Sequence, residues 1–308
     1  MRVLVTEFMD DKALGDFGSQ IDVNYAPDLV NNRKRLLEVA DQYDAFIVRN
    51  RTLVDGELIG RAKRLKAIGR LGVGLDNIDL KACDLNKIKV LPATGANASS
   101  VAEYVIASAL ILIRKTFGSN DQVLSGKWSR NMLGQGGEIA GRTMALVGFG
   151  ATARETAFRA KALGMHVAAF DPHIDRNADA WKDVRQCSLN ELFDCADVLS
   201  LHVPLIDSTK LLIDANAIKK LKDTAIVINT ARGGIIDDLA VIAAIKNGSL
   251  GGAALDVFET EPMKADRAAA YKGVSNLILT PHIAGLTLEG NARVSRLTVQ
   301  NVERALKL

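Results

Sequence analysis

The fold is decided by one stretch of the chain, TMALVGFGATA at residues 143–153. Its apolar run predicts a short buried strand, because the run ends abruptly at Gly148. Small and apolar residues then recur at helical spacing up to Gly164, which predicts a helix and its end. The turn between them reads Gly148-x-Gly150-x-x-Ala153, with alanine in place of a third glycine. Such a turn lets the backbone approach a pyrophosphate at a helix N-terminus, so the stretch predicts a dinucleotide site.

An acidic residue follows at the distance that this kind of site requires. The next predicted strand, 166–170, ends at Asp171, about 20 residues beyond the glycines. A carboxylate there accepts hydrogen bonds from the ribose hydroxyls of NAD and repels the 2′-phosphate of NADP, and Pro172 rather than an arginine follows it. The alternative to a ribose contact is that Asp171 only begins a turn with Pro172. The order of strand, glycines, helix, strand and acid favours a site for NAD.

Composition and length bound the class of protein. With 308 residues, 48% hydrophobic and 24% charged, the chain predicts an ordinary soluble protein of two domains. A net charge of +3 without a dense basic run argues against a nucleic-acid partner. The longest apolar stretch, 102–113, is too short to span a membrane, and the N-terminus enters a strand pattern without a signal peptide. The three cysteines, Cys83, Cys187 and Cys195, lack metal-type spacing, so we expect reduced thiols, no metal site and a cytoplasmic location.

Alternating strand and helix patterns predict the fold class, α/β with two Rossmann-like, doubly wound parallel-sheet domains. A break at 92–97 and the helix that ends the chain predict a first domain of residues 1–97 plus 286–308, with 98–285 inserted in it as the NAD-binding domain. A helix from Ser99 or Ser100 to about Lys115, with Glu103 in capping-box position, is apolar nearly all round. We expect it to be buried between domains or against a second subunit. The expected strands are 3–5, 21–23, 45–48, 65–68 and 88–91 in the first domain, and 144–147, 166–170, 198–201, 225–229, 252–255 and 277–279 in the second; the clearest helices are 29–40, 237–247 and 286–308.

Three predicted strands of the second domain end in reactive side chains. Arg232 follows the predicted strand 225–229 and is flanked by small residues. Glu261 follows the strand 252–255 and precedes a proline, and His282 follows the strand 277–279. A protonated histidine can neutralise the charge that hydride addition builds on a ketone oxygen, and a paired carboxylate orients it. An arginine can hold the carboxylate of a 2-oxo acid with two parallel bonds. Each residue alone can be a surface or turn residue, and His202, at another strand end, is a competing histidine that we expect to line the cofactor site.

These motifs resemble those of the D-isomer-specific 2-hydroxyacid dehydrogenases, the family of phosphoglycerate, glycerate and D-lactate dehydrogenases. The resemblance covers nearly the whole chain and rests on GFG at 148–150, DP at 171–172, HVP at 202–204, NTARG at 229–233, ALDVFETEP at 254–262 and LTPHIAG at 279–285. It implies an NAD-dependent oxidoreductase with catalytic Arg232, Glu261 and His282. The implied cofactor contacts are Gly148, Phe149, Gly150, Ala151, Thr152, Asp171, Pro172, His202, Val203, Pro204, Thr209, Thr230, Ala231, Asp256 and Gly285; the implied substrate contacts are Arg49, Asn50, Arg51, Arg70, Val73 and Gly74.

The family layout implies a cofactor domain inserted in the substrate domain, with crossings near Asn97 and Gly285 that act as a hinge. It also implies a homodimer joined through the long helix after the first crossing. Some relatives are NAD-sensing corepressors instead of enzymes, and a remnant without activity is a further alternative. The presence of the arginine, glutamate and histidine together favours the enzyme.

The first domain carries the only indication of which 2-hydroxy acid is used. Arg49 and Arg51 follow one predicted strand and Arg70 ends the next. A methyl group would not need such charge, so we expect a substrate with a second anionic group, such as 3-phosphoglycerate, 3-sulfolactate or a dicarboxylate. The alternatives are that these arginines face solvent or pair with Asp55 or Glu57, or that the enzyme is a glyoxylate or hydroxypyruvate reductase.

Overall fold

The computed structural model describes residues 1–115 and 119–307, which form two compact units. Unit 1 comprises Met1–Asn97 and Leu286–Leu308, and unit 2 comprises Ala98–Gly285. Each is described below by itself. Of the expected last helix, Leu308 lies outside the described residues.

Unit 1 is built on a parallel sheet of five strands in the order β2-β1-β3-β4-β5. Strand β3 is buried along its whole length, as the continuous apolar run AFIV requires of a strand covered on both faces. The strands are β1 Arg2–Val5, β2 Asp22–Tyr25, β3 Ala45–Val48, β4 Ala67–Arg70 and β5 Lys89–Pro92; the helices are α1 Asp11–Leu14, α2 Arg33–Val39, α3 Gly56–Arg61, α4 Leu80–Leu85 and α13 Leu288–Lys307, with 3₁₀ helices η1 Pro27–Asn31 and η2 Ala40–Gln42.

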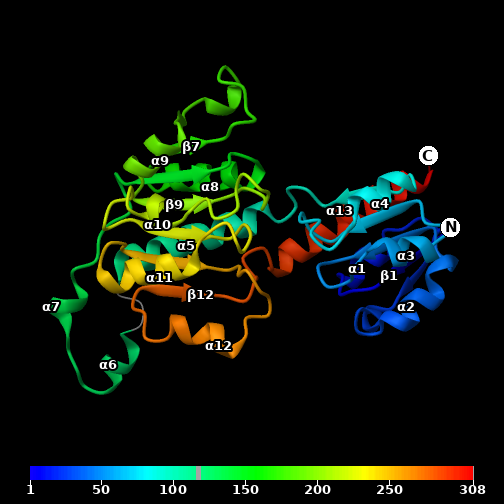
Figure 1. Cartoon of the computed structure of the whole chain (residues 1–308), viewed down its shortest axis with the longest axis horizontal. Helices are drawn as coiled ribbons and strands as arrows, with labels where there is room; N and C mark the ends of the chain where they lie inside the picture. The colour runs from blue at the N-terminus through cyan, green and yellow to red at the C-terminus, as the bar shows by residue number, and fades with distance from the viewer. Residues whose placement is uncertain (116–118, 308) are drawn as a thin grey trace. The chain divides into compact units, whose positions relative to one another are not determined.

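The last helix of the chain belongs to the core of unit 1. Figure 1 shows α13, in red, running along the sheet formed by the first strands of the chain. Its buried stripe of Val294, Val299, Val302 and Leu306 packs on Val3, Val5 and Ile47. This placement follows from the strong amphipathicity that its sequence carries.

Two expectations for helices are wrong. The helix expected over 29–40 is broken at Asn32, whose extended backbone ends η1 and whose side chain accepts a hydrogen bond from the N–H of Arg35 to cap α2. The long helix begins at Ala98, so Ser99 and Ser100 lie inside its first turn and form no capping box. Ser100 is buried there, and Ser99 bonds to Glu103 and Arg159.

Unit 2 is built on a parallel sheet of seven strands in the order β12-β11-β10-β9-β6-β7-β8. The short strand β8 was not expected from the sequence, because its two residues pair only with β7. The strands are β6 Thr143–Val147, β7 His166–Phe170, β8 Arg185–Gln186, β9 Val198–Leu201, β10 Ile226–Asn229, β11 Gly252–Leu255 and β12 Leu277–Leu279; the helices are α5 Ala98–Arg114, α6 Asn120–Leu124, α7 Arg130–Leu133, α8 Ala151–Ala162, α9 Leu189–Cys195, α10 Ala215–Ile218, α11 Asp238–Asn247 and α12 Ala265–Ala268, with 3₁₀ helices η3 Asp179–Trp181 and η4 Ala269–Tyr271.

The apolar face of α5 is covered within unit 2. This helix packs on α8 and β10, and its residues Val105, Ala109 and Leu112 are fully buried among sheet residues. The burial expected for the apolar residues of α5 is therefore provided largely within unit 2, by α8 and the sheet. Figure 1 shows that α6 and α7, which follow α5 in the chain, project away from this sheet.

Candidate active site

The predicted dinucleotide motif lies where the strand order of unit 2 reverses. From β6 the chain continues outward through β7 and β8, and then returns to β9 on the other side of β6. Ligands of doubly wound sheets bind at such a point, outside the carboxyl ends of the strands. Gly148 follows β6 with φ 86°, and a Cβ placed there would lie 2.8 Å from the carbonyl oxygen of His202, which follows β9. The first glycine of the motif is thus needed both for its backbone angle and for the close approach of the two loops.

Gly150 and helix α8 provide an open, positively polarised backbone. Gly150 is the N-cap of α8, no side chain caps the helix, and a Cβ at Gly150 would meet no atom within 4 Å. Ala151 is exposed and Thr152 half-buried, whereas Ala153 is fully buried. The free N–H groups of the first turn fit a pyrophosphate, and the alanine in the third small position serves packing on the sheet.

Asp171 lies at the end of β7 and holds the glycine turn in place. Its Oδ2 accepts a hydrogen bond of 2.9 Å from the N–H of Phe149, and its Oδ1 accepts one of 2.9 Å from the N–H of His173. The Phe149 ring is buried and stacks on Trp181 with centroids 5.2 Å apart. Each carboxylate oxygen retains a lone pair for a further donor, so the arrangement fits two ribose hydroxyls. Pro172, which follows Asp171 in the chain, is exposed.

The geometry separates the two candidate histidines. His202 Nε2 lies 2.9 Å from the hydroxyl of the fully buried Ser200. Burial lowers the pKa of His202 to about 4, so this imidazole is uncharged at neutral pH and does not serve as a proton donor there. In the same loop, Thr209 donates to the carbonyl of Pro204 at 2.6 Å and thereby shapes the turn after the half-buried Val203.

The loop after β10 presents Arg232. The side chain of Asn229, which is fully buried, makes two hydrogen bonds to the main chain of this loop. Its Nδ2 donates to the carbonyl of Arg232 at 2.9 Å, and its Oδ1 accepts from the N–H of Ala231 at 3.0 Å. The guanidinium of Arg232 donates to the carbonyl of Ala231 at 2.6 Å. The Thr230 hydroxyl is buried without a hydrogen-bond partner among the described residues. A buried hydroxyl of this kind fits a site that a bound group completes.

Asp256 organises the loop that carries His282. The residue is 1% exposed, and its carboxylate accepts hydrogen bonds from the Thr280 hydroxyl at 2.6 Å and from the N–H groups of Ile283 and Ala284 at 2.8 Å. The hydroxyl of Tyr104 in α5 lies 2.6 Å from that of Thr280. Asp256 and Thr280 therefore hold the loop that runs from His282 to Gly285. The cofactor contact that the family resemblance implies for Asp256 stays a prediction.

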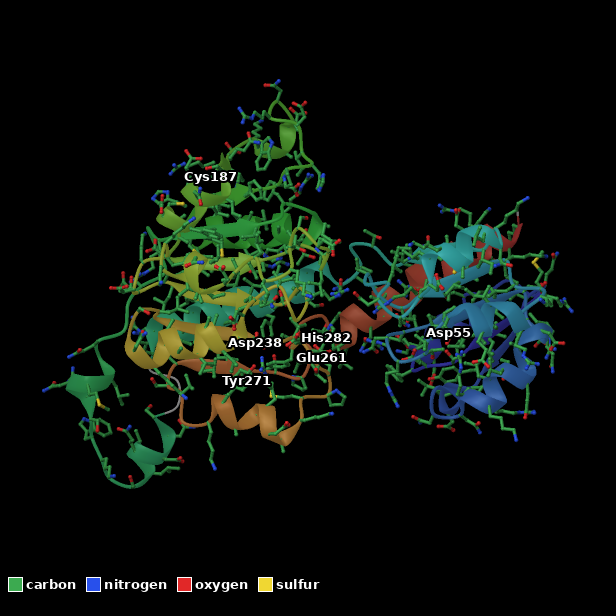
Figure 2. All side chains as sticks on the ribbon, in the orientation of Figure 1. Asp55, Cys187, Asp238, Glu261, Tyr271 and His282 are labelled. Atoms are coloured by element: carbon green, nitrogen blue, oxygen red, sulfur yellow. The ribbon has the colours of Figure 1, made fainter. Side chains whose placement is uncertain are left out.

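Glu261 and His282 form a hydrogen-bonded pair at the strand ends, where Figure 2 labels both. Glu261 Oε2 lies 2.7 Å from His282 Nδ1, and Glu261 Oε1 accepts a bond of 3.0 Å from the N–H of Phe258. His282 has φ 57°, in the left-handed region that residues other than glycine adopt only occasionally, and the bond from its N–H to the Asp256 carbonyl holds it there. With Nδ1 on the carboxylate, the His282 Nε2 is the ring nitrogen available to a ligand, and 41% of the side chain is exposed.

In unit 1, a buried glutamate that the sequence did not single out shapes the arginine loop. Glu7 follows β1 and is 4% exposed. Its Oε1 accepts from the N–H groups of Arg49 at 2.8 Å and Thr52 at 2.9 Å, and its Oε2 accepts from the N–H of Arg51 at 3.1 Å. Because β1 and β3 are the strands at which the order of this sheet reverses, the loop lies at its expected ligand edge. The signal in the sequence that could have singled out Glu7 is an acidic residue two positions after a central strand.

The arginines themselves do not pair with Asp55 or Glu57, which bind Arg33 instead. Half-buried Arg49 donates to Asn291 Oδ1 of α13 at 2.7 Å, and exposed Arg51 donates to Asn31 Oδ1 at 2.6 Å. Burial lowers the pKa of Arg49, and the charge of Glu7 opposes this shift. Asn50 is exposed between the two arginines.

Arg70 lies across its own loop. Its Nη1 donates to the carbonyl of Leu71 at 2.8 Å, and a Cβ at Gly72 would lie 1.7 Å from this same nitrogen. Glycine at position 72 thus makes room for the guanidinium. Val73 is exposed and Gly74 half-buried, and both are at the carboxyl end of β4, as expected for residues that offer backbone N–H groups.

Within residues 1–115 and 119–307, no group of three histidine, cysteine or acidic side chains is arranged to hold a metal ion. No helix of this described part is long and apolar enough to cross a membrane. All three cysteines are free thiols, with Cys83 and Cys187 buried.

Comparison with known proteins identifies the family. The family model for the D-isomer specific 2-hydroxyacid dehydrogenase, NAD binding domain, matches residues 106–284. The (S)-sulfolactate dehydrogenase of Chromohalobacter salexigens is 50% identical over 305 residues, which cover 99% of this chain and 98% of that protein. A D-3-phosphoglycerate dehydrogenase of Archaeoglobus fulgidus is 37% identical over 307 residues. This match covers 100% of this chain and 58% of the relative.

A solved structure agrees with the sequence comparisons. The crystal structure of D-lactate dehydrogenase from Aquifex aeolicus, complexed with NAD and lactic acid, superposes with a TM-score of 0.84 at 28% identity and covers 100% of this chain and 96% of that one. The expected α/β fold with two parallel sheets is thereby confirmed. The chain belongs to the D-isomer-specific 2-hydroxyacid dehydrogenases and is an NAD-dependent oxidoreductase of that family.

Proposed function

We propose that the protein interconverts a D-2-hydroxy acid that bears a second anionic group and the corresponding 2-oxo acid, with 3-sulfolactate as the foremost substrate. The observation that carries the proposal is the loop of Arg49 and Arg51, fixed by three backbone hydrogen bonds to Glu7. The 50% identity to an (S)-sulfolactate dehydrogenase over nearly the whole chain supports a sulfonate as the second group.

The (S) designation is consistent with a D-specific enzyme. In D-lactate the carboxylate outranks the methyl group in the naming rules, and the centre is (R). In sulfolactate the CH₂–SO₃⁻ group outranks the carboxylate, because sulfur has a higher atomic number than oxygen. The same spatial arrangement is therefore named (S), so one active-site handedness serves both acids.

The residues at the strand ends of unit 2 divide the chemistry among them. NADH, when bound, supplies the hydride that reduces C2 of the 2-oxo acid. The fork of Arg232 binds the substrate carboxylate with two parallel bonds. His282 donates its Nε2 proton to the oxygen on C2, and Glu261 stabilises the charged imidazole and fixes its orientation. In oxidation the neutral His282 accepts the hydroxyl proton at the same nitrogen.

The dinucleotide contacts are proposed from the fit of the site. Gly150 and the first turn of α8 offer unobstructed N–H groups for the pyrophosphate, while the N–H of Gly148 donates to the carbonyl of Phe170 at 2.7 Å and holds the turn. Asp171 accepts the ribose hydroxyls. The unpartnered Thr230 hydroxyl gains a partner when the cofactor binds. The Asp171 carboxylate disfavours a 2′-phosphate, so we propose that NAD is preferred over NADP.

The test is a comparison of substrates under one set of conditions. We expect kcat/KM for 3-sulfopyruvate to exceed that for pyruvate and hydroxypyruvate by about 100-fold, the value of two charge-assisted contacts. Arg49→Ala and Arg51→Ala should each remove about tenfold of this advantage and leave pyruvate reduction nearly unchanged. 3-Phosphohydroxypyruvate and oxaloacetate distinguish the anionic groups, and each assay is repeated with NADPH. Equal kcat/KM values for substrates with and without a second anionic group, or the highest kcat/KM with hydroxypyruvate, would refute the proposed role of Arg49 and Arg51.

We further propose that the protein is a cytoplasmic homodimer. Supporting the dimer, the segment of α6 and α7 exposes large apolar side chains: Val123, Leu124, Trp128 and Met132, of which Leu124 is 85% exposed. Apolar side chains gathered on a projecting segment are typical of an interface. Sedimentation velocity should give twice the mass of the 33.1 kDa chain, and Trp128→Asp with Leu124→Asp should give the chain mass. A single-chain mass for the wild type would contradict the proposal.

A further inference from the structure

The loop that carries Glu261 has its own support within unit 2. Glu261 uses both carboxylate oxygens: Oε2 contacts His282 Nδ1 and Oε1 accepts from the N–H of Phe258, at 2.7 and 3.0 Å. The direction of the carboxylate is therefore set by the Phe258 peptide. A shift of that peptide would change the bond between Glu261 and His282.

Two neighbours fix the Phe258 residue itself. On one side, a Cβ placed on Gly233 would lie 2.0 Å from both the carbonyl carbon and oxygen of Phe258, so the two backbones touch directly. On the other side, the Phe258 ring packs edge-to-face on Tyr271, with centroids 6.1 Å apart and an interplanar angle of 88°. Such aromatic pairs contribute about 0.5–1.5 kcal/mol beyond the burial of their surface.

Tyr271 is anchored in turn to the start of α11. Its ring is 5% exposed, and its hydroxyl donates to Oδ2 of Asp238 at 2.9 Å. Asp238 is 4% exposed, and its Oδ1 has no hydrogen-bond partner in the described chain. Burial raises the pKa of both groups, so Tyr271 stays a hydrogen-bond donor throughout the working pH range. Figure 2 labels Asp238, Tyr271, Glu261 and His282 in one part of unit 2.

A cavity borders part of the loop. The cavity has a volume of about 190 Å³, and its lining includes Phe258, Glu259, Thr260 and Met263 of the loop as well as Arg267 and Tyr271. The ion pair of Glu259 with Arg267 spans 4.0 Å between exposed side chains and contributes little. Phe258 and Tyr271 both line this cavity, so their contact with each other, together with the packing of Phe258 and Met263 on the core of unit 2, resists movement of the loop into it.

We propose that Tyr271, anchored by Asp238, is a positioning residue for the reaction: it holds Phe258, whose peptide N–H directs Glu261 onto His282. The inference rests on the proposed role of Glu261 and His282 as the acid–base pair. Because Tyr271 acts only through Glu261, its removal should matter only while Glu261 is present.

A double-mutant cycle of Phe258→Leu and Glu261→Gln tests the chain of contacts, with kcat for 2-oxo acid reduction as the readout. Phe258→Leu should lower kcat about tenfold in the wild-type background, because small misplacement of catalytic groups is costly. In the Glu261→Gln background the same change should lower kcat less than twofold. The dissociation constant of NADH should stay unchanged throughout. Phe193→Leu is the matched control, since Phe193 is 3% exposed in the same hydrophobic core, in α9, and should lose stability without loss of kcat.

Tyr271→Phe and Asp238 variants test the anchor while keeping the rings. Tyr271→Phe and Asp238→Leu, which remove the donor and the acceptor, should each lower kcat about threefold, again only when Glu261 is present. Asp238→Asn keeps an acceptor for the Tyr271 hydroxyl and should retain wild-type kcat. Equal losses of kcat in both backgrounds, or a Phe258→Leu variant that behaves like Phe193→Leu, would overturn the positioning role. A Glu261→Gln enzyme with wild-type kcat would instead overturn the acid–base pair itself.

Discussion

Replacement of His282 by glutamine should lower kcat for 2-oxo acid reduction by about 10²–10⁴-fold, the usual contribution of a general acid. Glutamine occupies similar space and can still donate to Glu261 Oε2, but it has no proton to give to the substrate oxygen. His202 does not replace it, because burial lowers the pKa of His202 to about 4 and leaves it uncharged at pH 7. Stopped-flow measurement of NADH oxidation at saturating substrate gives the value directly.

The control for this prediction is His166→Gln. His166 is exposed at the start of β7, at the opposite end of that strand from Asp171, and its replacement should leave kcat within twofold of the wild type. The affinity for NADH, followed by fluorescence, should be the same in both variants. A His282→Gln enzyme that keeps more than a third of the wild-type kcat would exclude His282 as the proton donor.

Arg232→Lys should lower kcat/KM for the 2-oxo acid by about 100-fold, although the charge is retained. Lysine is a point charge without the two parallel donors that match a carboxylate, so the carboxylate is bound less tightly and in a less defined orientation. The loop should keep its shape, because Asn229 binds the main chain of Arg232 and Ala231 rather than the guanidinium. The loss should therefore appear with every 2-oxo acid of the panel.

Arg185→Lys, on the exposed strand β8, is the matched control and should leave kcat/KM unchanged. Steady-state kinetics with 3-sulfopyruvate and pyruvate measure the effect. A loss below fivefold for Arg232→Lys would show that a single cation at this position is sufficient, and that the bidentate contact is absent.

The strands and the reactive strand ends could be predicted because their information is local. Mostly apolar runs end shortly before Gly148, His202 and Arg232, and the structure has β6, β9 and β10 there. The helix over 29–40 could not be placed because Asn32 ends one helix and caps the next, a choice between two hydrogen-bonded arrangements that periodicity does not register.

The supporting residues of the site lay beyond the reach of local patterns. Glu7 and Arg49 are 42 positions apart, and Asp238 and Tyr271 are 33 apart. Their contacts arise only when the parallel strands bring the loops together. Motifs predicted the reactive groups, whereas the side chains that hold those groups became visible only in the folded chain.

The bonding of Glu7 has an evolutionary consequence. It binds the arginine loop through the main-chain N–H groups of positions 49, 51 and 52, which every residue except proline possesses. These three bonds that fix the path of the loop are therefore independent of the side chains at positions 49 and 51. If Arg49 and Arg51 select the substrate as proposed, exchange of either side chain would change the acid that is used without rebuilding the loop, and laboratory selection for new substrates is best directed at these two positions with Glu7 left untouched.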